Sequence, residues 1–302
     1  MRRVELQFVV PPAAEGQPLG RFLRSRGVTA GMIRAVKHTG GGFFADAEPL
    51  HTNQAVHAGQ CVHFALPPDP PTSVVPQPVP LRIVYEDDFA AVLEKPAGLA
   101  VHPTLNYPDH TLANGWIEHL RQQGKTGVFR PVNRIDKNTS GLVLCAQNAF
   151  AAPLLAAGAQ KCYLAIVQGE MPPGPGQVEA PIGRRGDSII GRCVTPHGKY
   201  SLTAYTVLAA GGGCSLLACV PRTGRTHQIR VHMAYIGHPL AGDTLYGGDK
   251  KYIVRHALHC AVLRFPHPMT GALQRVQSPL PPDMQALAQK AGLLQGWSWQ
   301  QL

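Results

Sequence analysis

A proline-rich segment divides the chain and limits what each part can fold into. Between residues 67 and 80, seven of the fourteen residues are proline. Proline fixes φ and lacks an amide hydrogen, so this segment stays extended and joins neither a helix interior nor a central strand. At about 150 residues per domain, 302 residues suggest two domains. We therefore predict a small N-terminal module at residues 1–66, a linker at 67–80 and a larger domain at 81–302.

Both predicted parts have enough apolar material for a core. Hydrophobic residues make up 44% of the chain and charged residues 15%, which excludes a disordered or fibrous protein. Seven cysteines without a Cys-x-x-Cys pair indicate free thiols in a reducing compartment. Because no apolar run is long enough to span a bilayer and the start is signal-like only briefly, we expect no membrane partner and a cytoplasmic location.

The charge balance favours a polyanionic partner. Lysine and arginine total 28 against 18 acidic residues, and arginine outnumbers lysine by 19 to 9. The planar guanidinium of arginine binds phosphate at two points and stacks on bases. Nucleic acid is therefore one interpretation of the charge, and an ordinary basic protein is the other.

The N-terminal module shows the pattern of two short helices followed by strands. Leu19, Phe22 and Leu23 share one helical face. Thr29 is a candidate N-cap for a second helix that ends before the glycines at 40–42, and strands are expected at 43–44 and 62–64. The basic residues of the two helices form a candidate phosphate-binding face, with a solvated surface as the alternative: Arg21, Arg24, Arg26, Arg34 and Lys37.

The larger domain mixes strands and helices in irregular order, which favours the α+β class over a doubly wound sheet. Apolar runs predict strands at 81–85, 89–94, 142–147, 162–168 and 215–220. The consecutive apolar residues from Tyr163 to Val167 predict a strand covered on both faces. A helix is expected to start after Thr226 and to stop at Gly237.

Common catalytic and cofactor signatures are missing from the sequence. It has no phosphate-binding loop, no dinucleotide fingerprint and no nucleophile elbow. His227 and His232 are five residues apart and leave one helical face. His256 and His259 have the spacing of one helical face but supply only two ligands. We therefore expect neither a metal nor a cofactor.

Two polar segments carry candidate chemistry. Residues 131–141 place Asp136 beside Arg134 and Lys137, and nearby cations keep a carboxylate ionised as a nucleophile or base. The alternative is a turn whose side chains cap backbone amides. Residues 223–232 place Arg225 and Arg230 near a helix start, where they can bind an anion or pair with a carboxylate.

Together these motifs resemble the RluA-type pseudouridine synthase family. Arg134-Ile135-Asp136-x-x-Thr139-Ser140-Gly141 is similar to the catalytic motif of that family, and the similarity spans about residues 81–285. Other matching motifs follow the order of the family: Lys95-Pro96-x-Gly98-x-x-Val101-His102-Pro103, Lys161-x-Tyr163-x-Ala165-x-Val167-x-Gly169, Gly224-Arg225-Thr226-His227-Gln228-Ile229-Arg230-Val231-His232-Met233, Gly237-His238-Pro239-Leu240, Gly242-Asp243-x-Leu245-Tyr246-Gly247, Leu258-His259, His267-Pro268-x-Thr270-Gly271 and Pro279-Leu280-Pro281.

The resemblance implies an α+β catalytic domain whose central mixed sheet is largely antiparallel and flanked by helices and loops. The module before it resembles, more weakly, an alpha-L-type RNA-binding module. Two positions depart from the family pattern: Asn133 stands where the family usually has histidine, and Cys260 where it often has alanine. The arginine and aspartate of the catalytic motif are retained.

The implied activity is an isomerase that converts uridine in RNA to pseudouridine. The glycosidic bond breaks, the uracil turns, and a carbon–carbon bond forms through ring carbon 5, with no cofactor required. Asp136 is then the essential carboxylate, attacking covalently or acting at the sugar. Tyr163 lies against the uracil as acid or base, and Arg230 pairs with Asp136.

The same resemblance implies a set of RNA-binding residues. Arg134 would fill the gap that the flipped uridine leaves in its stack. The other candidates are Asn133, Lys161, Arg225 and His227. The expected partner is ribosomal or transfer RNA, bound by a monomer, and binding should weaken with added salt.

Three other functions remain open at this stage. One is a non-catalytic RNA-binding protein or chaperone on the same fold, against which Asp136, Tyr163 and Arg230 argue. The second is a hydrolase that uses Asp136 with a histidine. The third is an enzyme directed at DNA, which the charge allows but no motif supports.

Overall fold

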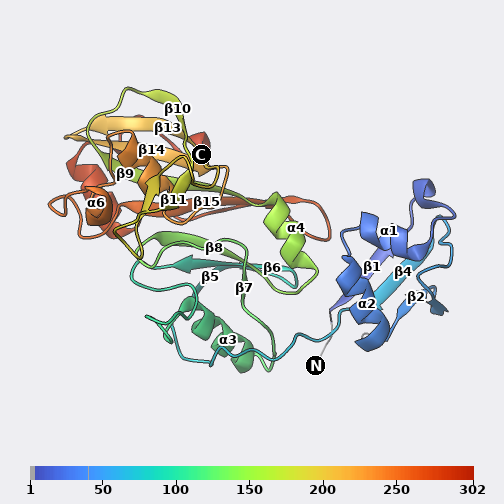
Figure 1. The fold of residues 1–302 in the computed structure, drawn as a ribbon. Coiled ribbons are helices and arrows are strands. Elements are labelled where there is room, and N and C mark those ends of the chain that lie inside the picture. The colour runs from blue at the N-terminus through green and yellow to red at the C-terminus, as the bar shows by residue number, and fades with distance from the viewer. Residues whose placement is uncertain (1–3, 40) are drawn as a thin grey trace.

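The proline-rich segment separates two sheets that share no strand (Figure 1). The computed structural model describes residues 4–39 and 41–302. As predicted, the segment from 67 to 80 contains neither helix nor strand. It is nevertheless attached to the larger part of the molecule, because Asn114 Nδ2 donates to Val75 O at 2.8 Å and Arg130 pairs with Asp69. The linker therefore follows a fixed path past the first helix of that part.

The N-terminal module packs two helices on a four-stranded antiparallel sheet of order β1-β4-β2-β3. Phe22 and Leu23 are fully buried, and the Phe43 and Phe64 rings meet edge to face. Thr29 Oγ1 accepts a bond from Met32 N, as expected of an N-cap. The elements of the module are β1 (Glu5–Val9), η1 (Pro12–Ala14), α1 (Leu19–Ser25), α2 (Ala30–Thr39), β2 (Phe43–Ala45), β3 (Glu48–Leu50) and β4 (Cys61–Ala65).

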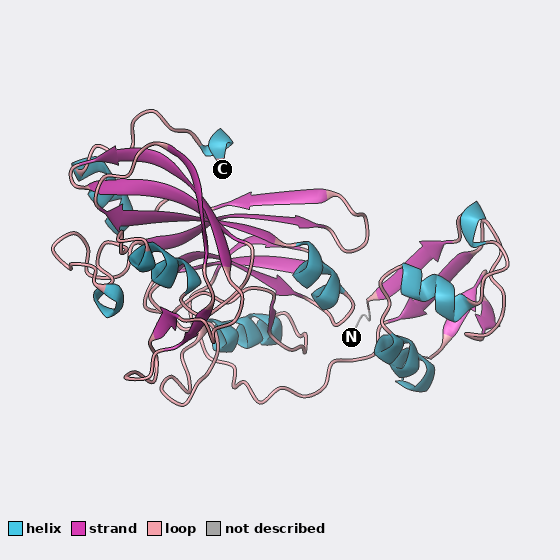
Figure 2. Cartoon of the chain, turned by 45° about the horizontal axis from the view of Figure 1, so that its top comes forward, coloured by secondary structure: helices cyan, strands magenta, loops and turns pink. Residues whose placement is uncertain are grey.

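The larger part is built on a ten-stranded sheet with helices against both faces (Figure 2). Helices α3 and α5 contribute to one core and α6 to the other. The elements are β5 (Arg82–Glu86), β6 (Ala90–Lys95), α3 (Leu112–Gln122), β7 (Arg130–Pro131), β8 (Ser140–Ala146), α4 (Ala151–Gly158), β9 (Gln160–Gln168), β10 (Gly174–Glu179), β11 (Ile182–Arg184), β12 (Arg192–Val194), β13 (Leu202–Gly211), β14 (Cys214–Pro221), α5 (Gln228–Tyr235), η2 (Thr244–Tyr246), β15 (Leu258–Pro266), β16 (Leu273–Gln277), α6 (Pro282–Lys290) and η3 (Trp299–Gln301).

A short parallel ladder joins two antiparallel halves of this sheet. The strand order is β10-β13-β14-β9-β15-β8-β6-β5, with β16 beside β15 and β7 beside β8. Only β15 and β8 run parallel among the described strands, pairing His259 with Ser140 and Cys260 with Gly141. Gly141 has φ +109°, and a Cβ there would lie 2.3 Å from Cys260 O, so the ladder requires glycine. The prediction of a mixed, largely antiparallel sheet is confirmed.

The strand predictions are largely confirmed, and one helical interpretation is wrong. Residues 164–167 on β9 are fully buried, as the apolar run predicts. His259 lies on β15 and His256 just before that strand, so these histidines share no helix. No helix among the described residues is long and apolar enough to cross a membrane.

Candidate active site

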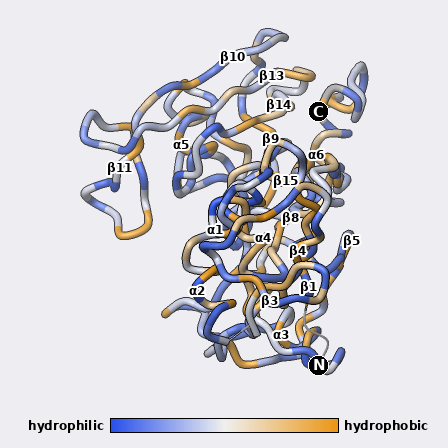
Figure 3. The backbone as a smooth tube through the Cα atoms, turned by 90° about the vertical axis from the view of Figure 1, so that its right-hand side faces the viewer, coloured by the Kyte–Doolittle hydropathy of each residue, from blue (hydrophilic) through white to orange (hydrophobic). Residues whose placement is uncertain are grey.

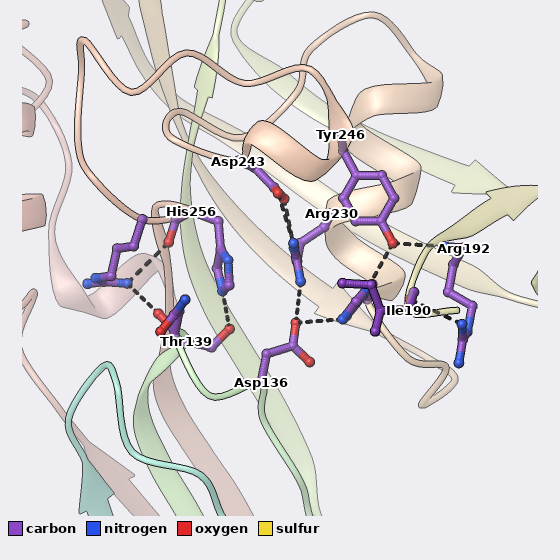
Figure 4. A network of polar contacts seen from close by, with 11 residues as sticks. Asp136, Thr139, Ile190, Arg192, Arg230, Asp243, Tyr246 and His256 are labelled. Atoms are coloured by element: carbon purple, nitrogen blue, oxygen red, sulfur yellow. Dashed lines mark hydrogen bonds and ion pairs between the residues drawn. The ribbon is translucent and has the colours of Figure 1, made fainter. Parts of the chain in front are cut away.

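Asp136 and Arg230 meet in a polar network at the start of β8 (Figure 4). Asp136 lies in the loop before β8, and Arg230 lies on α5. Arg230 Nη1 donates to Asp136 Oδ2 at 2.9 Å, which is the predicted pairing. The Asp136 side chain is 28% exposed, whereas that of Arg230 is 8% exposed. The carboxylate is therefore open to a substrate, while the guanidinium that holds it is closed off.

Asp243 fixes Arg230 from the opposite side. Arg230 Nε and Nη2 donate to the two carboxylate oxygens of Asp243 at 2.7 and 2.8 Å, a bidentate pair. Burial opposes the charge of Arg230, but hydrogen bonds and charges from Asp243 and Asp136 outweigh it and raise its pKa. Arg230 thus stays charged and points one remaining donor at Asp136.

Tyr163 lies on β9, close enough to Asp136 for the charge of that carboxylate to affect its pKa. The side chain is buried, and β15 places Cys260 directly opposite it in the ladder. Burial, the neighbouring Cys260 and the charge of Asp136 raise the pKa of Tyr163 well above its usual value, against a hydrogen bond from Asn133. The phenol therefore keeps its proton and can act as a donor.

Buried histidines hold the loop that carries Asp136. His256 Nε2 lies 2.8 Å from Thr139 Oγ1, and His259 Nδ1 lies 3.0 Å from Ser140 Oγ. Burial lowers the pKa of both histidines to about 4, so they are neutral at pH 7. Arg255 donates to Asn138 O at 3.1 Å and anchors the same loop. Contacts from β15 and from the segment before it thus hold the loop that carries Asp136 in place.

A buried lysine supports the loop from its other side. Lys95 is fully buried at the end of β6, and its Nζ donates to the carbonyls of Pro96, Leu99 and Lys137 at 2.7–2.9 Å. Burial, together with the charge of Arg255 and against that of Asp136, lowers its pKa to about 7. The lysine joins two motifs that are 42 residues apart in the sequence.

Comparison with known proteins identifies this arrangement. The family model described as RNA pseudouridylate synthase matches residues 90–235. A Bacillus subtilis protein named uncharacterized RNA pseudouridine synthase YjbO is 38% identical over 267 residues, which cover 86% of this chain and 94% of the relative. A ribosomal large subunit pseudouridine synthase D of Xanthomonas campestris is 34% identical over 309 residues, 93% of this chain and 91% of the relative. The chain belongs to the RNA pseudouridine synthase family.

The solved structures agree with the sequence relatives. Human RNA Pseudouridylate Synthase Domain Containing 1 superposes with a TM-score of 0.57 at 28% identity, covering 72% of this chain and 90% of the human one. The predicted RluA-type family, its α+β fold and its activity are therefore confirmed: this synthase is an isomerase that converts uridine in RNA to pseudouridine.

Two of the predicted RNA-binding residues of the synthase make contacts within the protein. Asn133 is buried; its Nδ2 donates to Leu142 O at 3.1 Å, and its Oδ1 accepts from Leu144 N at 2.7 Å. Both ends of the amide are thus engaged with β8, and the side chain is not offered to RNA. His227 is half-buried with its Nε2 3.7 Å from Asp136 Oδ2, so it faces the carboxylate rather than an open surface.

Three predicted residues lie where RNA can reach them. Arg134 is exposed two residues before Asp136. Arg225 is also exposed, and its Nε donates to Tyr200 O at 3.1 Å. Lys161 is half-buried on β9, on the same face as Tyr163. These cations lie on the loops and strands that carry the catalytic candidates.

Sequence reasoning quoted two further site residues only as motif letters. Asp243 and Tyr246 belong to the segment Gly242–Gly247, and both contact residues of the site. The sequence contains both partners of the ion pair, but Arg230 and Asp243 lie 13 positions apart, and no local pattern relates them. No group of three histidine, cysteine, aspartate or glutamate side chains among the described residues has the geometry of a metal site.

Proposed function

We propose that the synthase isomerises uridine through Asp136, with Arg230 and Tyr163 as its partners. The supporting observation is the asymmetry of the Asp136 carboxylate. Arg230 and His227 both lie on the side of Oδ2, whereas Oδ1 has no hydrogen bond among the described residues. A carboxylate held at one oxygen and free at the other is suited to act on the sugar of a flipped nucleotide.

Tyr163 serves as the proton donor in this proposal. Isomerisation breaks the bond from C1′ to N1, forms the bond from C1′ to C5, and transfers one proton from C5 to solvent while N1 gains another. Because its pKa is raised, the buried phenol keeps its proton at pH 7 and is not a base there. In this proposal Tyr163 gives its proton to N1, and the resulting phenolate regains a proton from solvent. Its position on β9, with Asp136 close enough for its charge to affect the phenol, supports this assignment.

We further propose large-subunit ribosomal RNA as the substrate, bound in the cytoplasm by a single chain. Four relatives from different bacteria have names that refer to the large ribosomal subunit. The exposed Arg134 fills the vacated position of the flipped base, and Arg225 and Lys161 bind flanking phosphates. The module at residues 1–66 adds contacts to RNA outside the site.

Tritium release tests this proposal. RNA labelled with tritium on uracil C5 loses the label to water when pseudouridine forms. We expect release from large-subunit ribosomal RNA with no added cofactor. Asp136→Ala should reduce the rate at least about 1,000-fold while RNA binding persists. Asp88→Asn, which alters an exposed carboxylate away from the site, is the matched control and should keep the full rate.

Other outcomes separate the parts of the proposal. Release from transfer RNA alone would reject the ribosomal substrate and keep the assignment of Asp136. Full release by Asp136→Ala would overturn the role of Asp136. Loss of release together with loss of RNA binding would show that Asp136 holds the loop rather than acts in the reaction.

A further inference from the structure

A chain of polar contacts leads from β12 to Asp136 (Figure 4). The backbone N–H of Arg192 donates to Tyr246 Oη at 3.0 Å. Tyr246 Oη lies 2.7 Å from His227 Nδ1, and His227 Nε2 lies 3.7 Å from Asp136 Oδ2. The β11–β12 hairpin that begins this chain projects from the body of the protein (Figure 3). The contacts therefore join a projecting hairpin to the reacting carboxylate.

The hydrogen-bond inventory of Tyr246 favours one tautomer of His227. The Tyr246 oxygen already accepts a bond from Arg192 N, and its own proton has no other acceptor than His227 Nδ1 among the described residues. Nδ1 is then the acceptor, so the single proton of a neutral imidazole is on Nε2. Burial, helped by the charges of Arg230 and Arg192 and opposed by two aspartates, lowers the pKa of His227 and favours that neutral form.

The backbone of His227 supports a constrained role. His227 is the N-cap of α5 and has φ +58° and ψ +19°, the left-handed conformation. Glycine adopts this conformation most easily, and among the other residues asparagine, aspartate and histidine are found in it most often. The left-handed backbone therefore sets the direction in which the His227 side chain leaves the start of α5.

We propose that His227 is a positioning residue for Asp136, held by Tyr246 in the tautomer that presents Nε2–H to Oδ2. This inference rests on the proposed function of Asp136. Arg230 and His227 then bind the same carboxylate oxygen from two directions, so the carboxylate cannot rotate and Oδ1 remains the reacting oxygen. The Nε2–Oδ2 distance shortens to a hydrogen bond when RNA fills the site, as catalytic contacts often do.

Two variants test different contacts in this series. Tyr246→Phe removes the hydroxyl and keeps the ring 5.0 Å from the Arg230 guanidinium. His227→Asn keeps an acceptor near the position of Nδ1 and tolerates the left-handed backbone, but has no atom at Nε2. We expect tritium release at saturating RNA to fall about 10-fold in Tyr246→Phe and about 100-fold in His227→Asn, with KM unchanged. The control is Tyr85→Phe, on the edge strand β5, which removes a hydroxyl that is bonded to Asp87. Its kcat and KM should be unchanged.

A spectroscopic measurement tests the tautomer without reference to activity. In protein labelled with ¹⁵N-histidine, the His227 resonances, identified by their loss in His227→Asn, should show Nε2 protonated. Tyr246→Phe should lose this preference. Protonation of Nδ1 in the wild-type protein would overturn the inference, even if Tyr246→Phe fails to fold.

Kinetic outcomes keep this inference distinct from the proposed function. If Asp136→Ala is inactive but His227→Asn keeps its kcat, only the positioning role fails. If His227→Asn raises KM and leaves kcat unchanged, His227 is an RNA-binding residue, as the sequence resemblance implied. If Asp136→Ala retains activity, the proposed function fails first.

Discussion

The N-terminal module and the catalytic domain bury different kinds of side chain. In the described residues of the module, 4–39 and 41–66, every buried residue is hydrophobic. The catalytic domain buries Arg230, Asp243, Arg255 and His256 among its core residues. Burying a charge is unfavourable unless it is paired and hydrogen-bonded. The contacts that shape the candidate active site are therefore also contacts on which the stability of the catalytic domain depends. The core of the module is apolar, and it extends to Phe150 of the larger part.

The largest expected effect comes from removing one partner of the buried ion pair. Asp243→Asn leaves the buried Arg230 without its bidentate carboxylate, and we expect the free energy of unfolding of the catalytic domain to fall by about 3–5 kcal/mol. All three tryptophans lie after residue 115, so tryptophan fluorescence during urea unfolding reports this domain alone. Tritium release should fall in parallel.

A core variant of the module provides the matched comparison. Leu23→Ala removes a fully buried side chain and should cost about 2–5 kcal/mol. Its cost should appear in far-ultraviolet circular dichroism but not in the tryptophan transition. A common shift of both transitions would show that the two parts unfold as one unit, and the comparison would fail.

Acid should destabilise the catalytic domain selectively. His256 and His259 have pKa values of about 4 in the folded protein, below the ordinary 6.5. Above pH 6.5 both histidines are neutral in the folded and the unfolded protein, so their contribution to the free energy of unfolding is fully present. Below pH 6.5 the unfolded chain takes up protons that the folded chain refuses, so stability falls as pH drops, by about 3 kcal/mol per histidine by pH 4.

Urea titrations at several pH values, followed by tryptophan fluorescence, measure this loss. His259→Gln should flatten the dependence below pH 6.5. An equally steep dependence in that variant would assign the acid sensitivity to other groups.

The smallest effect should come from the surface of the module. Arg21, Arg24 and Arg34 are exposed on α1 and α2, and replacing all three with glutamine should weaken RNA binding without changing kcat. Each lost phosphate contact to a single strand should reduce the slope of log K against log salt by about 0.7. Arg82→Gln, at an exposed position on β5, is the control. An unchanged slope in the triple variant would mean that these helices do not contact RNA.

Local patterns predicted the fold where the apolar residues alone define an element. The strand around residues 164–167 and the helices after Leu19 and Thr29 follow from periodicity, and the structure has them. Edge elements were not predicted. β10 reads as a loop because Gly174, Pro175 and Gly176 open it, yet it lies at the end of the sheet, where proline costs no ladder bond. β1 has one fully buried residue, Leu6, so its alternation of apolar and polar residues is too weak to predict a strand.

The active site was predicted through family motifs rather than through spacing. Asp136 and Arg230 lie 94 residues apart, and no local pattern relates them. The resemblance implied an RNA contact at Asn133, and it gave no indication that the amide bonds the backbone of β8. The roles of Asp243 and Tyr246 depend on which side chains lie next to them, and only the tertiary structure shows those neighbours.

The two-residue parallel ladder between β8 and β15 has a consequence for how the candidate site is aligned. Asp136 enters the site from the β8 side, whereas Tyr163 and Arg230 come from the strands and helix beyond β15. The Asp136 carboxylate and its proposed partners therefore belong to different halves of the sheet, and two residue pairs join those halves. Because a Cβ at position 141 would lie 2.3 Å from Cys260 O, any larger residue there would shift Asp136 relative to Tyr163 and Arg230.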